Sequence, residues 1–286
     1  MGHPLRRRAA IACRPVQPCP SARPSSGGPS PPWGTIIPVS GATLQAGPML
    51  AVVLAVLVAA GALAVWLGRL GPGWAVVTAA GRAVAQLAAV SLLITAVLRS
   101  GWWTGLFVLL MFTVAAVTST RRVGLPLGRL PWIAVALASG VLPVLALVLG
   151  SGVMPLKPIA VVPIAGIVIG GTMSATSQAA RRALDELSTR HGEYEAALAL
   201  GFLPRAAALE ICRPTAGQAL IPALDQTRTV GLVTLPGAYV GVLLGGASPV
   251  QAGVTQVLVL IGLLAAEAIA VLVTVQLVAA GLVDRG

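Results

Sequence analysis

The sequence predicts an all-α integral membrane protein with about seven transmembrane helices and one long cytoplasmic helical loop. Of the 286 residues, 57% are hydrophobic and only 9% are charged, whereas about 25% of the residues in soluble domains are charged. Apolar runs of about 20 residues recur along the chain, which is the length that a helix needs to cross the hydrocarbon core. These runs lack the alternation of a β-barrel, and lipid admits only helices and closed barrels.

Residues 1–47 differ from the rest of the chain. They are rich in Pro, Ser, Gly and Arg, so they cannot bury a core, and we predict a disordered tail. Its arginines would have to cross the membrane in the orientation given below. Either later loops overrule the tail, or the true start is Met49, which we favour because the composition of the tail matches nothing downstream.

Seven apolar runs follow the tail and define the predicted spans. They cover residues 49–68, 75–98, 102–120, 131–150, 158–177, 219–245 and 249–282. One set of alternate loops holds most of the arginines, including all those of 178–218, and the opposite set holds only Arg99 and Lys157. The positive-inside rule therefore predicts a multi-pass protein of the cell (plasma) membrane whose C-terminus is cytoplasmic.

Several classes of function are disfavoured by the composition. The net charge is +11, but aromatic residues are scarce and the basic residues lie between apolar runs, so we predict no nucleic-acid binding. Three cysteines and two histidines are spaced for neither a zinc site nor a redox pair. The chain has a single lysine, Lys157, and no GxxxxGK[ST] sequence. We therefore predict that it is not an enzyme and binds no cofactor such as ATP itself.

The long loop, residues 178–218, begins as a continuation of the fifth span. There Asp185 and Glu186 follow Arg181 and Arg182 at a spacing of four residues, which predicts two solvated ion pairs. A short helix is then expected to start near Glu195, which places this acid at the positive end of the helix dipole. Gly201 would allow a turn and Pro204 would begin a second helix.

This helix–turn–helix resembles the EAA motif of ABC-transporter membrane subunits, written EAA-x3-G-x9-I-x-L-P. The leucine of the motif is Arg213 here. The resemblance implies a coupling helix that docks on a cytoplasmic ABC ATPase subunit, which would bind ATP and Mg²⁺. An ordinary interfacial helix pair is the alternative. The matching positions are Glu195, Ala196, Ala197, Gly201, Ile211 and Pro214.

Polar, glycine and proline positions inside the spans are candidates for a translocation path. Gly166 and Gly170 form a GxxxG pair, for which close helix packing is the favoured interpretation. Pro222 and Pro236 are expected to interrupt the sixth span, and broken helices often mark substrate paths. The candidate path residues are Gly170, Met173, Asp225, Arg228, Pro236, Gly237 and Glu267.

Three of these candidates carry a charge. Asp225 and Arg228 are three residues apart, so an ion pair within the helix is favoured over a substrate role. Glu267 stands alone in the middle of the last span, where it must be neutral, paired or facing water, and it is a candidate proton or cation site. The residues show no obvious metal site.

Residues 163–173 and 221–252, together with the EAA-like loop, resemble the FetB-type permease family. These proteins are small membrane subunits of ABC transporters associated with bacterial iron export, and they have plant relatives tied to aluminium tolerance. The resemblance covers residues 49–284 and implies a seven-helix permease domain over 48–286, paired as a homodimer with two ATPase copies. The EAA loop is typical of importers, so a permease importing a small organic solute stays open as an alternative. An ATP-independent channel or carrier, which would need no docking loop, is a further alternative.

Overall fold

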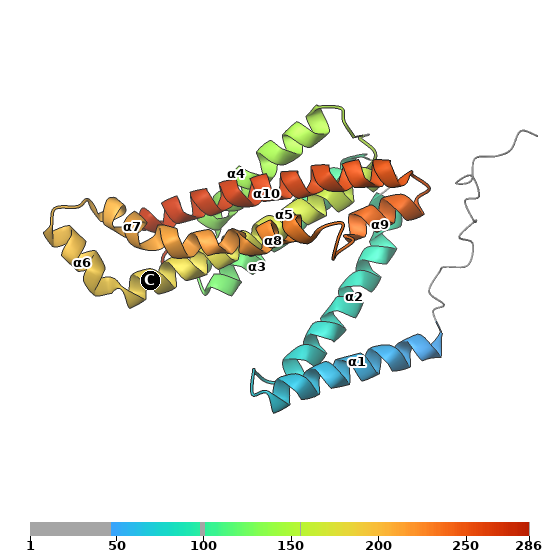
Figure 1. Ribbon diagram of the computed structural model, residues 1–286, viewed down its shortest axis with the longest axis horizontal. Coiled ribbons are helices and arrows are strands. Elements are labelled where there is room, and N and C mark those ends of the chain that lie inside the picture. The colour runs from blue at the N-terminus through green and yellow to red at the C-terminus, as the bar shows by residue number, and fades with distance from the viewer. Residues whose placement is uncertain (1–46, 98–100, 155, 286) are drawn as a thin grey trace, which may run out of the picture. The chain divides into compact units, whose positions relative to one another are not determined.

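The computed structural model describes residues 47–97, 101–154 and 156–285, and every regular element of these residues is a helix (Figure 1). Residues 1–46 of the predicted tail and the predicted external Arg99 lie outside the described residues. The chain divides into two compact units, 1–78 and 79–286.

The described part of the first unit consists of one helix, a turn and the first residues of a second helix. Helix α1, Pro48–Leu67, begins with a proline in its first turn, where a missing N–H costs nothing, and has no buried residue. A turn at residues 68–73 leads into α2, Trp74–Val97, which continues into the second unit. The turn is tight, since a Cβ on Gly73 would lie 2.9 Å from the carbonyl oxygen of Ala62. The exposed apolar face of α1 suits a lipid environment.

The second unit is built around α5, Pro158–Thr189, and α10, Pro249–Ala279, which pack against each other. Helix α4, Leu130–Gly150, packs on both of them, and α3, Gly101–Val123, packs on α5 (Figure 1). A short 3₁₀ turn, η1, Leu127–Arg129, joins α3 to α4. The core between these helices contains Ile133, Leu137, Val141, Val168 and Ala266.

Among the described residues, six helices are long and apolar enough to cross a membrane: α1, α2, α3, α4 with its preceding turn, α5 and α10. The predicted span 219–245 is not one continuous helix. It consists of a 3₁₀ turn, η2, Gly217–Leu220, followed by α8, Ile221–Thr229, and α9, Gly237–Leu244.

The position of the break in this span corrects the prediction for Pro222. That proline lies in the first turn of α8, where it is tolerated, so it does not interrupt the helix. The chain instead leaves the helix at Val230, whose backbone is extended, and Gly231 has a φ of +83°. Pro236 precedes α9 with its φ at −64° and extended ψ, so the second break occurs at the predicted residue.

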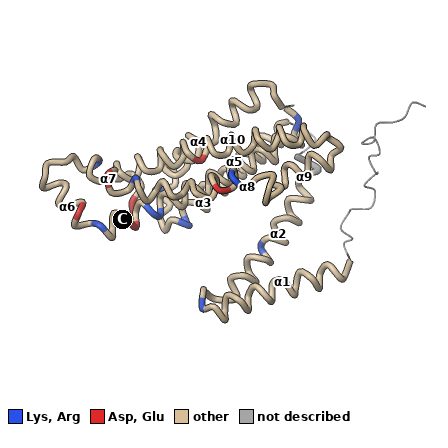
Figure 2. Tube along the Cα trace, viewed as in Figure 1, with Lys and Arg blue, Asp and Glu red and all other residues tan. Residues whose placement is uncertain are grey.

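Charged residues gather at the end of the second unit that carries α6, His191–Ala199, and α7, Pro204–Ala216 (Figure 2). The C-terminal residues lie at this same end. Two nitrogens of Arg129 donate to one carboxylate oxygen of Asp284, at 3.0 and 2.6 Å. Arg285 pairs with Asp185 at 2.7 Å and donates to the carbonyl oxygen of Val123 at 3.3 Å.

The two ion pairs predicted within α5 do not form. Asp185 pairs with the C-terminal Arg285, while Glu186 pairs with Arg190 at 3.4 Å. Arg181 donates instead to the carbonyl oxygen of Arg122. Because exposed pairs within a helix contribute only a few tenths of a kcal/mol, other partners along the chain easily replace them.

Candidate functional site

Helices α6 and α7 form a hairpin that continues directly from α5. Gly201 makes the turn between them with a φ of +90°, a backbone conformation that residues with a Cβ rarely adopt. Leu203 caps the second helix with extended backbone, and Pro204 occupies its first turn. The helix–turn–helix, the turn at Gly201 and the start at Pro204 are therefore confirmed.

The start of the first helix differs from the prediction. Helix α6 begins at His191, four residues before Glu195, so the acid in its first turn is Glu193. Glu193 accepts hydrogen bonds from Arg190, which lower the pKa of the carboxyl below its usual range. Glu195 lies in the second turn, 3.3 Å from the imidazole of His191.

Helix α7 is anchored to the helical core through one face. Ala207, Ala208, Ile211 and Cys212 are buried there, and this face packs against α5 and α10. The thiol of Cys212 donates to the carbonyl oxygen of Ala183 in α5 at 3.6 Å, and burial raises the pKa of this thiol to about 11. Movement of the hairpin is thereby tied to α5 and α10.

The outer part of the hairpin is exposed and partly apolar. Its tip presents three large apolar side chains, Leu200, Phe202 and Leu203, which are 80%, 51% and 75% exposed. Glu195 and Ala196 are exposed and Ala197 is half-buried. Large apolar side chains exposed together on a polar hairpin are typical of a surface that another protein or a membrane covers.

The residues of the EAA-like motif thus divide between two surfaces. Glu195, Ala196 and Gly201 are exposed, whereas Ile211 is only 4% exposed and belongs to the anchoring face of α7. Pro214 lies inside α7 and is exposed. The spacing of the motif therefore places its first half on the outer helix and its second half on the helix that holds the hairpin in place.

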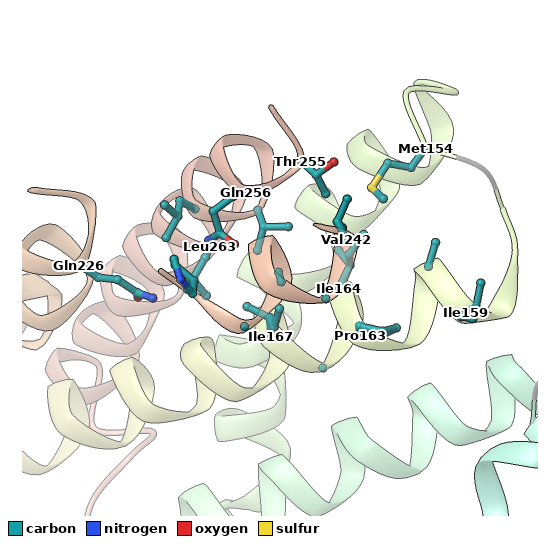
Figure 3. A pocket seen from close by; sticks show the side chains of 18 of the residues that line it. Met154, Ile159, Pro163, Ile164, Ile167, Gln226, Val242, Thr255, Gln256 and Leu263 are labelled. Atoms are coloured by element: carbon teal, nitrogen blue, oxygen red, sulfur yellow. The ribbon is translucent and has the colours of Figure 1, made fainter. Parts of the chain in front are cut away.

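A cavity of about 930 Å³ lies between α5, α9 and α10 (Figure 3). Most of its wall is apolar, including Pro163, Ile167, Val242 and Leu263. One side of the cavity is formed where the chain passes from the segment between α8 and α9 into α9, since Pro236 and Gly237 also line it. Irregular backbone at membrane depth is tolerated where it borders a cavity, which explains why the broken element lies here.

Sequence reasoning missed the polar side chains of this cavity. They are Gln226, Thr255 and Gln256 (Figure 3). Gln256 is 5% exposed, and its side-chain oxygen accepts a hydrogen bond from the backbone N–H of Tyr239 in α9 at 3.2 Å. A glutamine in the otherwise apolar α10 was the available signal, because a buried amide needs a partner.

The structure does not bring the predicted path residues together. Of the seven, only Pro236 and Gly237 line the cavity. Asp225 and Arg228 are exposed and pair with each other at 3.3 Å, which confirms the predicted ion pair within the helix. The backbone oxygen of Met173 accepts a hydrogen bond from Ser177, which in turn bonds Ser119 of α3, so this part of α5 faces α3.

The close helix packing predicted for Gly166 and Gly170 is found at Gly166, against α3, but not at Gly170. A Cβ on Gly166 would lie 3.0 Å from the methyl carbon of Met111, and one on Gly170 would meet nothing within 4 Å. The tight contacts are at Gly140 of α4 and Gly171 of α5, both of which face α10. The GxxxG spacing therefore identified the contact of Gly166 with α3 but not the tighter contacts with α10.

Glu267 lies in the helix contact beyond the cavity. It is 7% exposed, and a Cβ on Gly171 would lie 2.6 Å from its carboxyl oxygen. Leu263, one helical turn earlier on α10, lines the cavity and also packs on Gly171. Leu263 therefore separates the cavity from the carboxyl. Within the described part of the chain, Glu267 has no hydrogen bond or ion pair.

The described residues contain no group of three or more His, Cys, Asp or Glu side chains that could hold a metal ion. Asp225 is held in its exposed ion pair, and Glu267 is buried against Gly171. The carboxylates of the predicted path therefore lie apart rather than in one coordination sphere, which requires several ligands around the ion.

The apolar helices and the broken element beside a cavity define a multi-pass, all-α membrane protein of permease type. Residues 49–282 match the family described as "Uncharacterised protein family (UPF0014)". The chain belongs to this family, and no solved structure matches it.

Named relatives have both plant and bacterial sources. The chain is 33% identical to "UPF0014 membrane protein STAR2" of Oryza sativa over 212 residues, covering 73% of this chain and 74% of the relative. It is 39% identical to "Protein ALUMINUM SENSITIVE 3" of Arabidopsis thaliana over 36% of this chain and 38% of the relative. It is 32% identical to "Probable iron export permease protein FetB" of Escherichia coli, with 42% and 46% covered.

Proposed function

We propose that the protein is the membrane permease subunit of an ABC transporter in the cell (plasma) membrane. A separate cytoplasmic ATPase subunit docks on the α6–α7 hairpin and binds the ATP and Mg²⁺. The observation that carries this proposal is the hairpin itself, which exposes Glu195 and the apolar tip while α7 is anchored in the core. A channel or secondary carrier needs no such docking element.

The anchoring of the hairpin supports a mechanism for coupling. Helix α5 continues without interruption from the cavity at Pro163 to the hairpin at Thr189. Helix α7 packs on α5 and on α10, and both of these helices line the cavity. Displacement of the tip by the ATPase would therefore move two walls of the cavity, which is the kind of rigid-body motion that alternating access requires.

Iron, or another metal ion, is the proposed cargo, with export as its direction. The support is the relative whose name is "Probable iron export permease protein FetB". A second candidate is the import of a small organic solute. The volume of about 930 Å³ and the mostly apolar wall favour this second candidate, because sites for small organic molecules typically have about 300–1,000 Å³ and apolar linings.

The docking of an ATPase is tested by substitution of Glu195 with alanine. We expect Glu195→Ala to abolish stimulation of the partner ATPase and transport, with membrane insertion unchanged. Glu210→Ala is the matched control, since Glu210 is an exposed acid on α7 outside the motif. Normal ATPase stimulation and transport in Glu195→Ala would contradict the proposal and leave a channel or carrier as the explanation.

The cargo is tested in proteoliposomes that contain the permease with its ATPase. A panel of metal ions is offered on each side of the membrane, with ATP on the ATPase side. ATP-dependent movement of iron would support the first candidate. Failure of every metal ion to move in either direction would eliminate metal transport, and ATP-dependent movement of an organic solute would then support the second candidate.

A homodimer and a cytoplasmic C-terminus complete the proposal. The C-terminal residues lie at the same end of the second unit as the hairpin, through Arg285 and Asp185. Docking of a cytoplasmic ATPase therefore requires a cytoplasmic C-terminus. A protease site added after Gly286 should be cleaved only from the cytoplasmic side, and cleavage from outside would contradict the proposed orientation.

A further inference from the structure

A second, smaller pocket of about 350 Å³ lies between α3 and α5, next to the charged end of the second unit. Its lining is polar and basic, unlike that of the large cavity. It is formed by Arg122 at the end of α3 and by Ser174, Ser177, Gln178, Arg181 and Arg182 of α5. The three guanidinium groups are donors of the kind that bind phosphate oxygens, whereas the hydroxyls of Ser174 and Ser177 donate to the backbone oxygens of Gly170 and Met173.

None of the three arginines of this pocket forms an ion pair with a carboxylate among the described residues. Elsewhere at this end, Arg129, Arg190 and Arg285 each pair with a carboxylate. By contrast, Arg181 donates to a backbone oxygen and Arg182 donates to the amide oxygen of Gln218 at 3.1 Å.

Arg122 is the least engaged of the three arginines. Its side chain is exposed and makes no hydrogen bond or ion pair with any other described residue. Its backbone oxygen accepts the hydrogen bond from Arg181, which keeps the two arginines adjacent. Like charges held together without a counter-ion repel one another, so a bound anion would stabilise this arrangement.

We propose that this pocket binds the phosphate group of an anionic membrane lipid. Ser174 and Ser177 belong to the part of α5 that lies within the predicted span, and the arginines follow it, so the pocket is at the height of the lipid headgroups. Helix α3 runs from the pocket into the apolar layer with Leu109, Leu110 and Val114 each more than half exposed. These side chains offer a surface for the acyl chains.

A lipid phosphate is favoured over an acidic surface of a partner protein by this position. The pocket is formed by spanning helices, whereas the surface proposed for the ATPase is the tip of the α6–α7 hairpin, whose residues do not line the pocket. Basic pockets between membrane helices are a recognised way of holding lipid headgroups, and anionic lipids are enriched in the cytoplasmic leaflet.

The test measures the binding of phosphatidylglycerol and phosphatidylcholine to the full chain in mixed detergent micelles. Native protein is expected to prefer phosphatidylglycerol, and Arg122→Gln is expected to weaken that binding about five-fold. Arg122→Gln loses no internal hydrogen bond of the arginine side chain, so the melting temperature of this variant in phosphatidylcholine should be unchanged. Arg182→Gln is a second variant of the pocket lining. Arg213→Gln is the matched control, because Arg213 is exposed at the same end but outside the pocket.

Three results would overturn the proposal. The first is an equal loss of phosphatidylglycerol binding in Arg122→Gln and Arg213→Gln, which would indicate general surface charge. The second is inorganic phosphate binding as tightly as phosphatidylglycerol, which would identify a free anion as the ligand. The third is weaker ATPase binding in Arg122→Gln with an unchanged lipid preference, which would identify the partner protein as the ligand.

Discussion

The contact between α4 and α10 predicts that Gly140→Ala destabilises the protein. A Cβ on Gly140 would overlap the carbonyl oxygen of Ala266 and lie 3.0 Å from its carbonyl carbon and 3.1 Å from the Cβ of Ala270. Ordinary van der Waals contacts of a Cβ begin at 3.4 Å. Because the overlapped atom belongs to the backbone, relief requires a shift of one helix, and overpacking of this kind costs about 1–3 kcal/mol.

Gly170→Ala is the matched control for this substitution, since a Cβ at Gly170 would meet nothing within 4 Å. There the higher helix propensity of alanine should dominate and stabilise the protein by up to about 1 kcal/mol. Thermal unfolding in one detergent should therefore show a melting temperature lowered by roughly 2–10 °C in Gly140→Ala and slightly raised in Gly170→Ala. A melting temperature of Gly140→Ala equal to or above that of Gly170→Ala would refute the helix contact.

Three further predictions concern the hairpin and the buried carboxyl. Gly201→Ala should reduce ATPase stimulation, because a φ of +90° costs a residue with a Cβ about 1–2 kcal/mol; unchanged stimulation would show that the turn tolerates rearrangement. Cys212, as the single cysteine of a variant whose other cysteines are serine, should react with maleimide at pH 8 much more slowly than the exposed cysteine of Arg213→Cys. The reason is that burial raises the pKa of the Cys212 thiol to about 11. Equal rates would contradict the anchoring of α7. Glu267→Gln should keep the melting temperature and slow transport at least about ten-fold, because the carboxyl is a candidate proton or cation site. Normal transport in this variant would show that the Glu267 side chain serves helix packing alone.

The elements that depend on neighbouring residues were predictable. The spans follow from apolar length, and six of the seven predicted spans match single helices, whereas 219–245 is broken. The predicted continuation of α5 past its span is also found. The hairpin follows from Gly201 and Pro204, whose backbone preferences act within one or two residues. The ion pair between Asp225 and Arg228 is equally local.

The features that failed depend on which helices meet. Neither the spacing of Gly166 and Gly170 nor any other local pattern shows that Gly140 and Gly171 are the glycines facing α10. The ion pair of Asp185 with Arg285 joins residues 100 positions apart, so no spacing rule along a helix could find it. The break before α9 was expected at a proline, but its other limit, at Val230, is not marked by one.

The sequence by itself determined that this protein is helical, lies in a membrane and carries a two-helix hairpin after a long span, because apolar length, glycine and proline act locally. Only the tertiary structure decided that Gln226 and Gln256 meet at one cavity, that Glu267 is buried against Gly171, and that α7 is held by α5 and α10. These contacts depend on the rotation of each helix about its axis. That rotation is set by close packing between helices distant in sequence, which no single segment encodes.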